Sequence, residues 1–162
     1  MGENFLNGSI PKGLFILPHL SQKLLLDGNK FTDNIPDEIG KLQQLSKIDF
    51  SHNSLSDKIA PKIIQCKLLT YVDLSRNQLF DEIPKEITGM HILNYLNVSH
   101  NHLIRSIPTS ATSIQSLTFV DFSYNNLSSL VPGTDQFSYF NYTSFLANVD
   151  LCGPYLGEGG VG

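Results

Sequence analysis

The chain has 162 residues, a formal net charge of −4 and only 16% charged residues. This length suits one domain with a sizeable core, and the acidic balance excludes a broad basic surface for nucleic acid. No apolar run approaches the roughly 18 residues that a membrane-spanning helix needs. The residues after Met1 show no basic segment followed by an apolar one, so no secretion signal is expected there.

A repeat of 24 residues is the main feature of the sequence, which contains 23 Leu and 13 Asn. One Asn marks each copy, with apolar residues three and five before it and two and six after it. These Asn residues are Asn29, Asn53, Asn77, Asn101 and Asn125, and an equivalent Asn4 lies 25 residues before the first. Five copies in one phase indicate stacked coils, each burying its apolar side against its neighbours.

The alternating apolar residues before each Asn predict a short strand with one buried face. Stacking pairs these strands into a parallel sheet, and we expect each Asn amide to satisfy backbone groups of its own and the next coil. A Pro that follows most copies should end strand pairing on the outer side. The pattern predicts an α/β repeat fold: a right-handed solenoid with a parallel sheet on its concave face and a mostly irregular or 3-10 convex side.

These residues resemble the plant-specific leucine-rich repeat, L-x-x-L-x-L-x-x-N-x-L-x-G-x-I-P, over almost the whole chain. Residues 1–132 match the repeats. Residues 133–162 form a degenerate C-terminal cap and flexible tail, in which 137–145 and 151–154 resemble the cap of plant receptor-like kinase ectodomains. Segments 48–53, 66–70 and 152–157 are similar to the last repeats of the CLAVATA/BARELY ANY MERISTEM group, whose members are membrane receptor kinases that perceive small secreted CLE peptides.

The resemblance implies protein recognition on the extracellular side of the plasma membrane. It makes the chain a membrane-proximal, co-receptor-facing part of a peptide receptor, with a protein or secreted peptide ligand and a smaller leucine-rich repeat co-receptor kinase (SERK-like) as partners. No cofactor and no enzyme activity are expected, because the sequence contains no V-A-I-K, H-R-D or D-F-G kinase element. Two alternatives stay open: a stand-alone secreted repeat protein, such as an inhibitor of cell-wall-degrading enzymes, and a decayed, non-functional copy.

The sequence departs from the family pattern in three places. The family Cys that would pair with Cys152 is replaced by Gly159, which predicts a free thiol. The first coil has no polar cap, so its apolar flank of Phe5, Leu6, Ile10 and Leu14 is expected to face water. The family Gly four residues after the Asn survives only as Gly8; if this position has a positive φ, Asp is better tolerated than Arg or Ser. The later copies carry Asp33, Asp57, Asp81, Arg105 and Ser129.

Three columns of side chains recur one copy apart on the predicted sheet, and each is a candidate contact for a partner. The aromatic column is the most distinctive, because an exposed aromatic row makes a rigid amphipathic strip. Asp is a common repeat filler at its position. A solvated sheet face is the competing interpretation for the whole surface. The columns are Tyr71, Tyr95 and Phe119; Asp49, Asp73 and Asp121; and His52, Arg76, His100 and Tyr124.

Four N-x-S/T sequons are candidate glycosylation sites and favour an extracellular parent. They begin at Asn7, Asn97, Asn126 and Asn141.

Three patterns that suggest other chemistry carry little weight. Asp49, Ser51 and His52 lie together, but adjacent strand residues point to opposite sides or flank a turn. The segment 157–162 matches G-x-G-x-x-G, with no strand before it and no helix after it. Asn97 interrupts the acidic column that could hold a cation, so no metal is expected.

Overall fold

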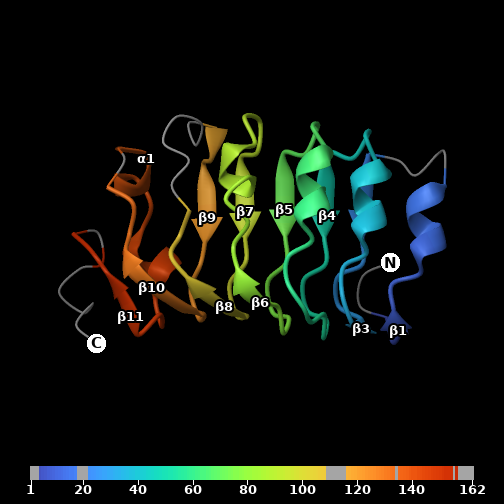
Figure 1. Cartoon of the computed structure of the whole chain (residues 1–162), viewed down its shortest axis with the longest axis horizontal. Helices are drawn as coiled ribbons and strands as arrows, with labels where there is room; N and C mark the ends of the chain where they lie inside the picture. The colour runs from blue at the N-terminus through green and yellow to red at the C-terminus, as the bar shows by residue number, and fades with distance from the viewer. Residues whose placement is uncertain (1–3, 18–21, 109–115, 134, 155, 157–162) are drawn as a thin grey trace.

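The structure is a computed structural model of the chain, and it describes residues 4–17, 22–108, 116–133, 135–154 and 156. The coils follow one another along the long axis of the molecule, with β1 near one end and β11 near the other (Figure 1). Within the described ranges, no helix has the length and apolar character needed to cross a membrane.

The alternating apolar residues form a five-stranded parallel sheet in the order β2–β4–β5–β7–β9, as the repeat predicts. Neighbouring strands pair in one phase, so Leu24, Ile48 and Val72 lie side by side. The central residue of each strand is buried in the core. The strands are β2 (Lys23–Leu25), β4 (Lys47–Asp49), β5 (Tyr71–Asp73), β7 (Tyr95–Asn97) and β9 (Phe119–Asp121).

A second set of strands follows the Asn of most coils, and the sequence pattern does not predict it. Four of these strands form a parallel sheet in the order β11–β10–β8–β6, and β1 pairs with β3. The regular sequence pattern has only one apolar position in this segment, two residues after the Asn, so no alternation marks it as a strand. The strands are β1 (Asn7–Ser9), β3 (Lys30–Thr32), β6 (Phe80–Glu82), β8 (His102–Arg105), β10 (Asn126–Leu130) and β11 (Asp150–Cys152).

Short 3-10 helices form the return path of the coils, as expected for that side. Pro36 precedes η2 and Pro61 opens η3, where the fixed φ of proline suits the first turn. Each of η1 to η3 places an apolar side chain in the core. The helices are η1 (Lys12–Ile16), η2 (Asp37–Lys41), η3 (Pro61–Gln65) and η4 (Ile87–Gly89).

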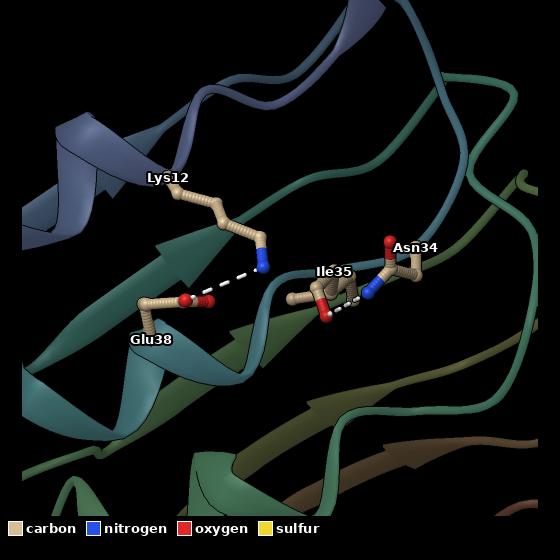
Figure 2. A network of polar contacts seen from close by, with 4 residues as sticks. All are labelled: Lys12, Asn34, Ile35 and Glu38. Carbon is tan, nitrogen blue, oxygen red and sulfur yellow. Dashed lines mark hydrogen bonds and ion pairs between the residues drawn. The ribbon is translucent and has the colours of Figure 1, made fainter.

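An ion pair joins the first two coils on this side, and an Asn side chain bonds to the backbone within one coil. Figure 2 shows the Lys12 ammonium 3.4 Å from a carboxylate oxygen of Glu38, and the Asn34 amide donating to the carbonyl of Ile35 at 3.3 Å. A hydrogen bond from its own backbone and the nearby Lys12 ammonium lower the pKa of the Glu38 carboxyl. Water screens this exposed pair, so it adds little to stability.

One continuous core runs through all the coils, from Ile10 to Leu156. Leu74, Val98 and Phe122, which repeat the same position in three coils, are fully buried. Burying each such side chain is worth about 1.5–3 kcal/mol before the entropy cost of ordering it. The stack of coils therefore supplies the core that a single repeat lacks.

Each repeat Asn joins two coils through the backbone. The Asn77 side-chain oxygen accepts from the N–H of Leu55 at 2.9 Å, and its amide donates to the carbonyls of Phe50 at 3.0 Å and Leu74 at 3.1 Å. Leu55 and Phe50 belong to the preceding coil, which corrects the expectation of bonds to the next coil. The same bonds recur at Asn53, Asn101 and Asn125.

The C-terminal segment adds one more coil to this ladder. The side-chain oxygen of Asn148 accepts from the N–H of Leu127 at 3.0 Å, and its amide donates to the carbonyls of Phe122 and Phe145 at 3.0 Å each. In this coil, η6 (Tyr142–Phe145) takes the place of the strand beside β9, and α1 (Asp135–Ser138) precedes it. Asn148 lies 23 residues after Asn125, one short of the period, so the strict spacing misses it.

Candidate protein-binding face

Three aromatic side chains form a continuous stack on the exposed face of the five-stranded sheet. We call Tyr71, Tyr95 and Phe119 the aromatic row. Their ring centroids lie 4.0 and 4.4 Å apart, and both pairs are within 7° of parallel. The stack follows from the sheet register, which makes the three residues direct partners. The predicted column is therefore a physical row across three strands.

Within the row, neighbouring rings cover each other's faces. Tyr71 and Tyr95 are half-buried and Phe119 is 40% exposed. Burial, together with the adjacent Tyr95 and nearby carboxylates, raises the pKa of the Tyr71 hydroxyl above its usual range. The Tyr71 hydroxyl therefore stays protonated at neutral pH.

The carboxylates of the acidic column accept hydrogen bonds from the Ser two residues further along the chain. A side-chain oxygen of Asp73 accepts from the N–H of Ser75 at 2.9 Å and from its hydroxyl at 2.7 Å. Asp49 and Asp121 make the same pair of bonds with the Ser two residues on. Burial raises the pKa of the Asp73 carboxyl, and the two bonds from Ser75 oppose that shift. The carboxylates thus have a structural role; contact with a partner stays a prediction.

The column beside the Asn takes a left-handed backbone conformation. His52, Arg76, His100 and Tyr124 have φ values between 54° and 55°. The His100 ring stacks on Tyr124 at 4.2 Å and 8°. Burial, followed by the charge of Arg76, lowers the pKa of His100. Gly28 in the first copy, with φ 63°, was the one sequence signal of this conformation.

The sequons occupy different surroundings. Asn7 on β1 and Asn126 on β10 are exposed. Asn141 is also exposed, and its side-chain oxygen accepts from the N–H of Thr143 at 3.0 Å. Asn97 lies on the five-stranded sheet, half-buried, and accepts from the hydroxyl of Ser99 at 2.8 Å. Glycosylation stays a prediction at all four.

Both cysteines are free thiols. Cys66 is buried, its thiol donates to the carbonyl of Ile39 at 3.1 Å, and burial raises its pKa to about 11. An inert packing role follows from that environment. Cys152 is exposed at the end of β11. Gly159 and the G-x-G-x-x-G match at 157–162 lie outside the described residues.

The structure brings no catalytic pair together at the Asp49–Ser51–His52 cluster. The Ser51 hydroxyl donates to the carboxylate of Asp49 at 2.7 Å, so its proton is directed to the acid and not to the imidazole. Among the residues that the structure describes, no group of three His, Cys, Asp or Glu side chains is placed to hold a metal ion. What the face offers is an aromatic strip beside partly buried carboxylates.

Comparisons with known proteins agree with this geometry. Residues 22–42 and 68–90 match the Leucine Rich Repeat family. The chain is similar to the ectodomain of the receptor kinase GASSHO1/SCHENGEN3 from Arabidopsis thaliana, solved with CASPARIAN STRIP INTEGRITY FACTOR 2, with TM-score 0.90 and 38% identity. It is also similar to the Arabidopsis receptor kinase HAESA, solved with the peptide hormone IDA and the co-receptor SERK1, with TM-score 0.85 and 32% identity.

These relatives are much longer than this chain. The first match covers 96% of this chain and 18% of the solved GASSHO1 chain, and the second covers 97% of this chain and 26% of the solved HAESA chain. The chain is therefore a leucine-rich repeat solenoid that closely matches part of the ectodomains of plant leucine-rich repeat receptor kinases.

Proposed function

We propose that the chain is a protein-recognition segment of a plant receptor-kinase ectodomain, acting on the extracellular side of the plasma membrane. Its aromatic row contacts a secreted peptide or a smaller leucine-rich repeat co-receptor. The observation that carries this proposal is the stack of Tyr71, Tyr95 and Phe119 on an exposed sheet face. The fold does not require rings there, since Lys23 and Lys47 occupy the same column in the preceding strands.

The relatives support the choice of partner. GASSHO1 and HAESA were each solved with a bound factor or peptide hormone, and HAESA also with the co-receptor SERK1. A finer part of the proposal is membership of the CLAVATA/BARELY ANY MERISTEM group, with a CLE peptide as ligand. It rests on segments 48–53, 66–70 and 152–157 alone. The co-receptor-facing position belongs to the same proposal.

The test compares binding of the purified chain and of Tyr71→Ala/Tyr95→Ala to the SERK1 ectodomain, with and without a CLE peptide, by biolayer interferometry. We expect the wild-type chain to bind and the double variant to bind about tenfold more weakly, because buried aromatic anchors dominate protein interfaces. Tyr139→Ala is the matched control, since Tyr139 is 81% exposed and lies just after α1, away from the row. Circular dichroism checks that all three chains are folded.

Equal binding of the double variant would contradict the role of the aromatic row. Inhibition of a purified polygalacturonase without any SERK1 binding would favour the alternative of a secreted inhibitor. A chain that shows no cooperative unfolding would favour the decayed copy.

A further inference from the structure

The aromatic row ends differently on its two sides. At the β5 end, the Lys47 ammonium lies 3.9 Å from the centroid of the Tyr71 ring and covers its outer face. At the β9 end, Phe119 is 40% exposed, and no ring or cation among the described residues lies on its outer face. The equivalent residue of the following coil is Tyr142, six before Asn148, and it makes no ring contact with Phe119 in the described part of the chain.

A carboxylate stands beside each end of the row. Asp49 lies two residues after Lys47 on β4, and Asp121 lies two residues after Phe119 on β9. Residues two apart on a strand point to the same face. One oxygen of Asp121 accepts both bonds from Ser123, at 2.9 and 2.6 Å, and the other receives no hydrogen bond from a described residue.

We propose that the exposed part of the Phe119 ring and the carboxylate of Asp121 bind an arginine side chain of the partner. The guanidinium stacks on the Phe119 ring as the Lys47 ammonium covers Tyr71. It pairs with the Asp121 oxygen that no described residue hydrogen-bonds. A planar guanidinium combines ring stacking with carboxylate pairing better than an ammonium does. The net charge of −4 also attracts a cationic partner group to the chain.

This inference rests on the proposed function and deepens it, because it names the chemistry of one partner contact. The row then has a cation at both ends: one supplied by the chain itself and one supplied by the partner. An acidic or neutral partner residue at the same place gains nothing from Asp121, so the site discriminates by charge.

The test is an NMR titration of the full chain, labelled with ¹⁵N, with the peptide acetyl-Gly-Gly-Arg-Gly-Gly-amide. The matched probe replaces Arg by citrulline, which has the same shape and no charge. We expect the amide signals of Phe119 and Asp121 to shift with the Arg peptide, and the citrulline peptide to bind about threefold more weakly or less.

Two variants separate the ring from the charge. Phe119→Leu keeps an apolar side chain without a π face. Asp121→Asn keeps an acceptor for Ser123, as Asn97 does for Ser99 on β7. Each variant is expected to weaken binding of the Arg peptide about threefold. Tyr139→Leu is expected to leave the titration unchanged.

Equal shifts with the two peptides, or titrations that neither variant changes, would overturn the arginine site. If SERK1 binding still depends on Tyr71 and Tyr95 in that case, the proposed function stands and only this inference falls. If the Arg peptide binds as expected but SERK1 does not, the arginine site stands and the co-receptor part of the proposed function falls.

Discussion

At the scale of single residues, the coils turn through backbone conformations that most side chains avoid. The position four after the Asn has φ 78° at Gly8, and it keeps a positive φ of 63° to 74° where other residues replace the glycine. Asp57 eases its own turn, because its carboxylate accepts from the N–H of Lys58 at 2.8 Å. A left-handed non-glycine residue costs roughly 1–2 kcal/mol, so each coil carries a strain that stacking offsets.

Ser129→Gly should therefore stabilise the protein. Ser129 has φ 74°, and relief of that strain exceeds the roughly 0.5–1 kcal/mol entropy cost of a glycine. We expect the free energy of unfolding to rise by about 0.5–1 kcal/mol in urea titrations. Ser128→Gly, one residue earlier on the same strand and without a positive φ, should lower it. Two variants of equal stability would show that the turn is not strained.

At the scale of one coil against the next, hydrogen bonds between asparagine side chains and backbone groups hold neighbouring coils in register. Asn77, for example, bonds two backbone groups of the preceding coil: the carbonyl of Phe50, just after β4, and the N–H of Leu55. These backbone groups are buried in the turn, where water cannot replace the lost partner. The amide therefore acts as part of the backbone of the solenoid.

Asn77→Ala tests this link. Asn77 is 7% exposed, and its loss leaves the N–H of Leu55 without its partner. The carbonyl of Phe50 keeps its bond from the Asn53 amide and loses the one from Asn77. The expected loss is about 1–3 kcal/mol of unfolding free energy, measured by urea or thermal denaturation. Asn126→Ala, at an exposed Asn outside the ladder, should change stability by far less. A loss as large at Asn126 would argue against the ladder as the cause.

At the scale of the whole molecule, the first coil leaves apolar surface uncovered. Phe5 is 84% exposed and Leu6 is 43% exposed, as predicted from the sequence. Ile10 is 2% exposed and Leu14 is half-buried, so the prediction that these two also face water is wrong. Both pack against the core of the stack, which extends into the first coil. The uncovered flank is therefore smaller than expected.

Phe5→Glu/Leu6→Lys should keep the chain monomeric at concentrations where the wild type associates. The backbone of Leu6 still donates to Asn29 and accepts from Lys30, so the fold survives the change. Light scattering after gel filtration measures the association. Tyr139→Lys, at a single exposed ring near the other end, should leave the wild-type behaviour unchanged. A wild type that stays monomeric and melts reversibly would contradict this prediction.

The five-stranded sheet, the repeat Asn positions and the aromatic row could be predicted from the sequence. Stacking turns a fixed spacing along the chain into direct neighbours in space, so residues 24 apart become partners. Tyr71 and Tyr95 needed no other information to be placed side by side. The same logic fails at Asn148, where the spacing falls to 23. It also overlooks the strands after the Asn, such as β6, because one regular apolar position per copy gives no alternation there.

The sequence by itself determined which residues repeat, which of them are buried and which column is aromatic, because these depend only on period and side-chain chemistry. Only the tertiary structure decided how the columns are used. It shows that the Asp side chains bond to Ser, that the column beside the Asn is left-handed, and that Lys47 covers one end of the aromatic row. These features depend on side-chain rotamers and on the distance between coils, which a repeat period does not encode.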